Sequence, residues 1–452
     1  MSYGKRDLSE VPLLFKIPRC YDSHLHLTST GEMASTLELS SVRKAADFSL
    51  LDIKGIYRRQ DWLVGWGFDD TQWSESVPLN RQTLDKFFPE IPVAFTRRDG
   101  HVLWLNTAAF KKLGFLKPKE NWEFDLLPYI DFGADGLPTG SLKDRALDLV
   151  LFAIPKSSDL QVRSYFEIAF TKMLKMGFTH VREMMTTPQM WQVLLKMEEA
   201  RDLRNYVELN FHCPHLDLLD ETISVFKEAR RTETLHLRPA AIKIFIDGAL
   251  GSSGAFLNKD YEDSAHQGTL LWPAEQIKET LHKAWKESIP VSLHTLGDGA
   301  SLVALQQAQS LRRQNVVGQL HLEHVEVMSD SAVELMKDLD VVCHIQPSHF
   351  LTDKEWLKKR LGSRIKDCFP WKRLEKAGVP FYFGSDTPIE PPDLKLTLQG
   401  LKSASDFGIP SMQMDWTFPH SHPDTHWGSK CWTEISRDAE IIKVVVDGEP
   451  IF

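Results

Sequence analysis

Short apolar runs alternate with longer helical patterns through most of this 452-residue chain, and that alternation constrains its fold more than any other feature. The runs are rich in Val, Ile, Phe and Leu, and helical segments follow them, which is typical of crossover helices around a parallel sheet. Eight such runs predict an α/β chain folded as a TIM (β/α)8 barrel. The predicted strands are residues 14–22, 178–183, 207–213, 241–247, 290–295, 319–325, 341–346 and 380–386.

Two segments fall outside this pattern. The gap between the first and second predicted strands is far longer than a crossover needs, so we expect a large insertion from about residue 30 to about residue 162. Near the other end, the apolar run 441–446 precedes Asp447-Gly448, which is a hairpin signal. This last piece is expected to be a remnant of a small β-domain.

Composition excludes several classes of protein. A net charge of −9 and a pI near 6.0 argue against sequence-independent binding of nucleic acid, which needs a basic face. The chain has no apolar run of about 18 residues, so no membrane-spanning helix is expected, and its N-terminal segment lacks the apolar stretch of a signal peptide. The five cysteines are widely spaced and form no Cys-x-x-Cys pair, which favours buried reduced thiols in a cytoplasmic protein.

Residues that bind metals stand at or near the ends of several predicted strands, where a parallel barrel gathers its reactive groups. Singly, each is more often a structural residue. Together they would bury many polar groups at one point, which is costly unless a metal ion is present. The candidates are His24, His26, Lys243, His294, His324 and Asp386.

The chemistry of these residue types suits a metal-dependent reaction. Neutral imidazoles and a carboxylate bind zinc or a similar divalent ion, which lowers the pKa of a bound water so that hydroxide exists near neutral pH. An ammonium group would repel a metal, but Lys243 fits if carbon dioxide converts it to a carbamate whose two oxygens bridge two ions. Asp386 is expected to act as the general base and later as the acid for the leaving group.

The order of these residues, and the sequence that flanks them, resembles the amidohydrolase superfamily and within it the amidohydrolase-3 branch, which includes N-substituted formamide deformylase. The resemblance covers roughly residues 14 to 400, and its motifs are specific as a set. The matching motifs lie at residues 21–26, 98–101 with Trp104 and Asn106, 138–140, 243–252, 294–298, 323–324, 346–349 and 384–388.

The resemblance implies that the six candidates hold one or two divalent ions, most plausibly zinc, with Lys243 carboxylated in the two-metal form. It also implies substrate contacts from Arg98, His101, Trp104 and His349, although tryptophans of the insertion could instead build its own core. The implied activity is hydrolysis of an amide-like C–N bond of a small molecule by metal-bound hydroxide. Alternatives are a deaminase or cyclic-amide hydrolase with a mononuclear site, and a metal- or ligand-binding protein whose catalysis has lapsed. A homo-oligomer is possible, and neither nucleic acid nor a membrane is an expected partner.

The chain departs from the family pattern at both ends. The small β-domain is expected to be truncated, with residues 1–13 as its N-terminal remnant, 14–400 as the hydrolase barrel and 401–452 as a tail that carries the other remnant. Ser253 stands where the family usually has an arginine. The stretch 411–430 contains His420, His422 and His426, which we expect to lie in a solvated tail.

Overall fold

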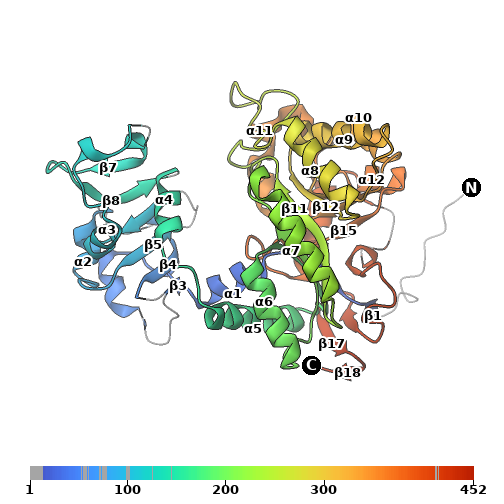
Figure 1. Cartoon of the computed structure of the whole chain (residues 1–452), viewed down its shortest axis with the longest axis horizontal. Coiled ribbons are helices and arrows are strands. Elements are labelled where there is room, and N and C mark those ends of the chain that lie inside the picture. Colours follow the sequence, from blue (N-terminus) through green and yellow to red (C-terminus); the bar gives the residue numbers. More distant parts are fainter. Residues whose placement is uncertain are drawn as a thin grey trace, which may run out of the picture. The chain divides into compact units, whose positions relative to one another are not determined.

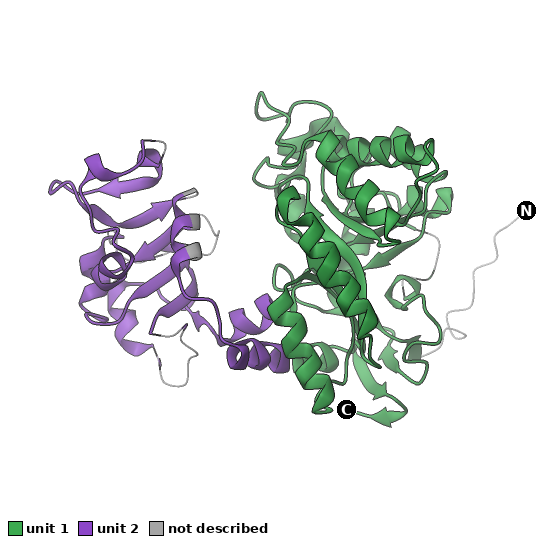
Figure 2. Ribbon diagram, in the orientation of Figure 1, with its two compact units in different colours: residues 1–27, 169–452 green, residues 28–168 purple. Residues whose placement is uncertain are grey.

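The structure is a computed structural model that describes residues 14–451, apart from residues 52, 54–58, 60, 71–72, 74–78, 98–101, 125, 144, 413–414 and 416. The chain divides into two compact units (Figure 2). Unit 1 comprises Met1–Leu27 and Ala169–Phe452, and unit 2 comprises Thr28–Ile168. Unit 2 is therefore inserted into the sequence of unit 1.

Unit 1 is built around a sheet of eight parallel strands that are hydrogen-bonded in chain order. The two outermost strands meet beyond their carboxyl ends, where Asp386 N donates to His24 O at 2.8 Å and His26 N donates to Thr387 O at 2.9 Å. The predicted TIM barrel is confirmed. Its strands are β2 (Tyr21–Leu25), β9 (His180–Thr186), β10 (Tyr206–His212), β11 (Leu237–Phe245), β12 (Val291–Thr295), β13 (Leu320–His324), β14 (Val341–Ile345) and β15 (Phe381–Phe383).

Helices follow these strands and cover the outside of the barrel (Figure 1). In α8, the buried residues Ile277, Leu281, Ala284 and Trp285 recur at helical spacing, so one face packs inward while the opposite face stays polar. Sequence signals also set the start of α6, where Thr187 Oγ1 accepts from Met190 N at 3.2 Å. These helices are α6 (Pro188–Glu199), α7 (Leu219–Arg231), α8 (Ala274–Lys286), α9 (Asp298–Arg312), α10 (Asp330–Met336), α11 (His349–Leu361), α12 (Trp371–Ala377) and α13 (Leu394–Asp406). A further helix, α5 (Asp159–Lys175), includes the boundary between the two units.

The first predicted strand, 14–22, is wrong in its extent, because the chain forms two strands there. β1 (Leu14–Pro18) ends before Arg19, whose φ of 47° turns the backbone, and β2 starts at Tyr21. β1 pairs antiparallel with β16 (Trp432–Ser436), which pairs with β17 (Ile441–Val446), which pairs with β18 (Glu449–Pro450). The two ends of the described chain therefore meet in a small sheet of four strands.

The expectation of a solvated histidine-rich tail is also wrong for two of its three histidines. His420 and His422 are 1% and 2% exposed, whereas His426 is exposed. His420 Nδ1 donates to Tyr21 O at 3.2 Å, and His422 Nε2 lies 3.2 Å from Glu208 Oε1. These partners lie on strands of the barrel, so this part of the tail packs against it.

Unit 2 has a mixed sheet of six strands and two hydrophobic clusters. Asn106 organises one edge of the unit, because its Oδ1 accepts from Ala109 N at 2.9 Å, at the start of α3, and from Val93 N at 3.0 Å. The strands, in sheet order, are β3 (Leu37–Glu38), β4 (Leu63–Phe68), β5 (Val93–Arg97), β6 (Val102–Leu105), β8 (Pro138–Lys143) and β7 (Ile130–Phe132). The helices are α1 (Leu27–Ser35), α2 (Arg81–Asp85), α3 (Thr107–Leu113) and α4 (Arg145–Ala153).

The helices and the cysteines bear on two expectations from composition. Across the described ranges, no helix has both the length and the apolar character needed to cross a bilayer. All five cysteines are free and buried.

The contact between Gly384 and β2 yields a first prediction. A Cβ at position 384 would lie 2.6 Å from His24 N and 2.7 Å from His24 Cβ, and backbone atoms cannot move aside as a flexible side chain can. We expect Gly384→Ala to lower the free energy of unfolding by roughly 1–3 kcal/mol, measured by urea denaturation. Gly251→Ala is the control, since its nearest neighbour is the Trp356 side chain at 3.2 Å. Equal losses in the two variants would contradict the close approach of β15 to β2.

Candidate metal centre

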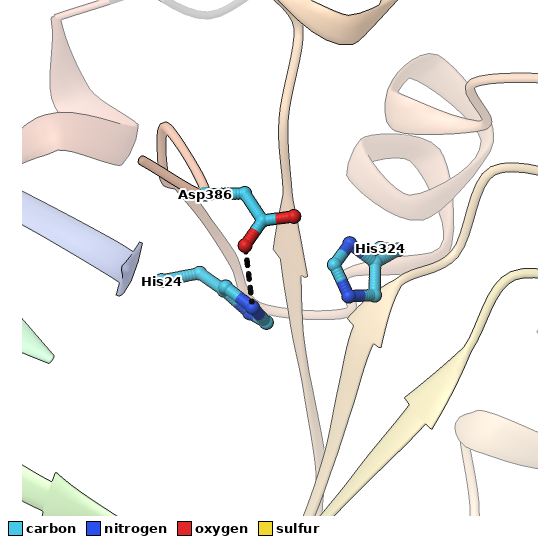
Figure 3. Close-up of side chains that lie close together, drawn as sticks. All are labelled: His24, His324 and Asp386. Carbon is cyan, nitrogen blue, oxygen red and sulfur yellow. Dashed lines mark ion pairs between the residues drawn. The ribbon is translucent and has the colours of Figure 1, made fainter. Parts of the chain in front are cut away.

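Three ligand-type side chains converge at the carboxyl ends of β2, β13 and β15 (Figure 3). His24, His324 and Asp386 each offer a ligand atom, and these atoms lie within 4.8 Å of one another. Asp386 Oδ1 is 3.4 Å from His24 Nε2 and 3.1 Å from His26 Nε2. Since both histidines of the His-x-His pair face one carboxylate, residues 24 and 26 point to the same side, as strand geometry requires.

The remaining two candidates border this group. The His294 ring centroid lies 4.4 Å from that of His324, which in turn is 4.5 Å from that of His24. Lys243 is completely buried, and its Nζ lies 5.0 Å from the ring centroid of Phe245. Among the described residues, neither Lys243 Nζ nor His294 Nδ1 has a hydrogen-bond partner.

Two of the six candidates have a left-handed backbone. His324 has a φ of 71° and Asp386 a φ of 58°, which costs a residue other than glycine about 1–3 kcal/mol. Successive residues of a regular strand face opposite sides, yet Glu323 and His324 both approach His24. The turned backbone at His324 accounts for this, and strain of this kind is typical of functional sites.

A buried ion pair contacts the Nδ1 side of the His24 ring. His24 Nδ1 lies 2.6 Å from Glu323 Oε2, and Glu323 Oε1 accepts from Arg182 Nη1 at 2.7 Å and from Ser292 Oγ at 2.6 Å. Burial alone would raise the pKa of Glu323, but Arg182 and the neighbouring histidines hold it well below its ordinary value. An ionised carboxylate at Nδ1 fixes the proton there and leaves Nε2 free to bind a metal.

His324 and the loop after β15 have similar support. His324 Nδ1 lies 3.0 Å from Gln346 Oε1, so its Nε2 is also free. Asp22 Oδ1 accepts from His24 N at 3.2 Å and from Ser385 N at 3.0 Å, and therefore joins β2 to the loop that carries Asp386.

The protonation states of these groups suit a divalent cation. Burial holds the pKa of His294 and His324 well below the ordinary value, so both imidazoles are neutral. Burial would raise the pKa of Asp386, but His24 and His26 lower it well below its usual range, so the carboxylate is ionised. Burial lowers the pKa of Lys243 to about 8, which makes an uncharged amine accessible. The neutral imidazoles of His294 and His324, the Asp386 carboxylate and the unpartnered amine of Lys243 form a donor set that fits zinc or a similar ion.

The predicted substrate-contact residues have different outcomes. His349 lies near the centre, with Nε2 3.8 Å from Asp386 Oδ2 and Nδ1 3.2 Å from Glu326 Oε1. Trp104 is completely buried in a hydrophobic cluster of unit 2, where its indole nitrogen donates to Asn80 O at 3.0 Å, and this gives it a packing role. Arg98 and His101 lie outside the described residues.

Sequence reasoning missed several charged residues around the centre. Glu183, in the middle of β9, accepts from Leu27 N at 2.5 Å and from Met185 N at 2.8 Å. Asp353 forms a second group of potential metal ligands with Glu326 and His349, and burial together with Glu326 raises its pKa to about 8. A carboxylate within a strand or helix looks like a surface residue in the sequence, so no sequence signal separates these from solvated ones.

Comparison with known proteins places the fold and the centre in a class. The chain is similar to an uncharacterized metal-dependent hydrolase from Pyrococcus furiosus, at 26% sequence identity and a TM-score of 0.71, over 86% of this chain and 77% of the other. A model of the amidohydrolase family matches residues 17–401. The protein is a metal-dependent hydrolase. It belongs to the amidohydrolase family.

Two named relatives share most of its length. YtcJ of Bacillus subtilis strain 168, an amidohydrolase by name, is 29% identical in an alignment of length 407 that covers 88% of this chain and 75% of YtcJ. N-substituted formamide deformylase of Arthrobacter pascens is 23% identical in an alignment of length 389 that covers 82% of this chain and 70% of the deformylase. The predicted resemblance to the amidohydrolase-3 branch is confirmed.

The ion pair between Arg182 and Glu323 leads to a prediction about stability. Glu323→Gln leaves Arg182 buried without a charged partner, so we expect the free energy of unfolding of the metal-free protein to fall by about 3–5 kcal/mol. Ser292→Ala, which removes one neutral hydrogen bond to the same carboxylate, is expected to cost only about 1 kcal/mol.

This contribution depends on pH in a defined direction. Because folding lowers the pKa of Glu323, its stabilisation is fully present above the ordinary value of 4.5 and is lost as the pH falls through the lower folded pKa. Chemical denaturation in EDTA at several pH values should show the difference between native protein and Glu323→Gln shrinking below pH 4.5. A difference that grows on acidification would contradict the ion pair.

Proposed function

We propose that the protein hydrolyses an amide-like C–N bond of a small molecule, with His24, His26, Lys243, His294, His324 and Asp386 as the ligands of one or two zinc ions. The observation that carries the proposal is the ionised Asp386 carboxylate, held 3.1 and 3.4 Å from the imidazoles of the His-x-His pair. The named relative that is a deformylase supports this bond type, because its name states the removal of a formyl group from an N-substituted formamide.

A bound divalent ion supplies a water whose pKa is lowered toward neutrality and polarises the substrate carbonyl. Asp386 would accept the proton of that water, since it is ionised and its second oxygen, Oδ2, lies on the side of His349, 3.8 Å from Nε2. It then donates the proton to the leaving amine.

His349 is placed to stabilise negative charge during the reaction. Burial would lower its pKa, but the hydrogen bond to Glu326 and the charge of Asp386 raise the pKa to about 9. A protonated imidazole whose Nε2 lies 3.8 Å from Asp386 Oδ2 can donate to an oxygen that becomes anionic in the transition state. Its Nδ1 partner, Glu326, keeps the ring oriented.

A mononuclear deaminase or cyclic-amide hydrolase is the second candidate. The observation that favours it is the compact group of His24, His324 and Asp386, which could hold one ion by itself. In the two-ion form, Lys243 would carry a carbamate and bridge the ions. Its pKa of about 8 makes this addition of carbon dioxide chemically accessible, because the uncharged amine is the reactive species.

The bond type is tested with the zinc-loaded protein and a panel of N-formyl and N-acyl arylamines, cyclic amides and aminopurines. We expect release of amine from at least one N-formyl or N-acyl member. Asp386→Asn should lower kcat by roughly 10²- to 10⁴-fold, since it removes the group that transfers the proton. Asp393→Asn, at the start of α13, is the control and should be active. Turnover restricted to cyclic amides or aminopurines would favour the second candidate, and no turnover by protein with full metal content would contradict both.

The number of ions is tested separately through Lys243. We expect about two zinc ions per chain in native protein purified with bicarbonate, and a loss of about one ion in Lys243→Ala, because a carbamate can bridge two metals. Elemental analysis measures the number of zinc ions per chain, and the mass of the intact chain shows whether Lys243 carries the carbamate. His426→Ala, which removes an exposed histidine, should leave the metal content unchanged. One ion in both native protein and Lys243→Ala would contradict the bridging role.

A further inference from the structure

A cavity of about 530 Å³ lies at the carboxyl ends of β10 and β11, next to the metal centre. His212 ends β10 and Phe245 ends β11, and both side chains line the cavity. Leu271 and Trp272 contribute from the long connection after β11, and Gln276 contributes from the first turns of α8. Its volume lies within the range of about 300–1,000 Å³ that is usual for pockets that bind small molecules.

The side chain of Phe245 separates the cavity from the metal centre. The Phe245 ring, which lines the cavity, lies 4.9 Å from the ring of His294 and 5.0 Å from Lys243 Nζ. The His212 ring lies 5.4 Å from that of Phe245. In the sheet, His212 is paired with Lys243, and Phe245 with His294. Only the Phe245 side chain would therefore separate a molecule in the cavity from His294 and Lys243, two of the proposed metal ligands.

One wall of the cavity suits a flat, apolar group. Phe245, Trp272 and Leu271 provide an aromatic and aliphatic surface, and Leu271 is 54% exposed although it is apolar. The imidazole of His212, next to Phe245, can form hydrogen bonds through its ring nitrogens. Gln276 adds an amide, and the exposed residues His215 and Asp217 add ionisable groups to the rest of the lining.

We propose that this cavity is the subsite for an aromatic substituent of the substrate. The aromatic ring would lie against Phe245 and Trp272, while the scissile bond faces the metal centre beyond Phe245. This inference rests on the proposed function for its substrate, but the binding of an aromatic group can be measured without any turnover.

The test uses Leu271→Trp, which fills the cavity from its exposed rim and leaves the proposed ligands untouched. Calorimetry with indole as the probe should show binding to the native protein, and binding to Leu271→Trp should be weaker by roughly 10- to 200-fold, as for a pocket that loses room for its ligand. Leu235→Trp, at a leucine that is 61% exposed elsewhere in unit 1, is the matched control and should bind indole as the native protein does. Metal content should be equal in all three proteins.

The same variants test the aromatic subsite separately from the proposed hydrolysis. For a substrate pair such as N-benzylformamide and N-methylformamide, Leu271→Trp should lower the ratio of kcat/KM for the aromatic member to kcat/KM for the small member by a similar factor. Indole binding that is lost in Leu271→Trp, with no amide hydrolysed by the native protein, would uphold the subsite and contradict the proposed function. Indole binding that is absent in the native protein, or unaffected by Leu271→Trp, would overturn the subsite.

Discussion

The buried hydrogen-bonded chain from Arg182 through Glu323 to His24 is the interaction on which the rest of the centre depends. It crosses the barrel from β9 to β13 to β2, and its distances of 2.7 and 2.6 Å are those of charge-assisted bonds. A carboxylate without partners would be protonated or excluded from such an interior. Since Arg182 keeps Glu323 ionised, Glu323 can orient His24, and the ring faces Asp386 through Nε2.

The centre also shows how a barrel brings together side chains that the sequence separates widely. Each proposed ligand stands near the carboxyl end of a strand, and the backbone hydrogen bonds from Asp386 N to His24 O and from His26 N to Thr387 O join the first strand to the last. Positive φ angles at His324 and Asp386 turn two of the ligands toward the others. Binding of a cation would repay this strain and the burial of several polar groups without partners.

Much of this could be predicted from the sequence, because hydrophobic periodicity reveals strands and the order of ligand-type residues reveals the centre. The split of residues 14–22 could not, since the apolar pattern runs through the turn at Arg19. Nor could the burial of His420 and His422, because a polar segment packed on a barrel has the same composition as a solvated one. Glu323 acts through partners on other strands and Glu183 accepts from the start of α1, and the cavity beside Phe245 is formed by segments that meet only in the fold.

Anomalous X-ray diffraction at the zinc edge tests most directly whether the proposed ligands form a metal centre. In crystals of the zinc-loaded protein, we expect one or two anomalous peaks about 2.0–2.3 Å from imidazole nitrogens of His24, His26, His294 or His324 and from a carboxylate oxygen of Asp386. Peaks confined to exposed histidines such as His426, with no peak among these residues, would contradict the claim that they form a metal centre.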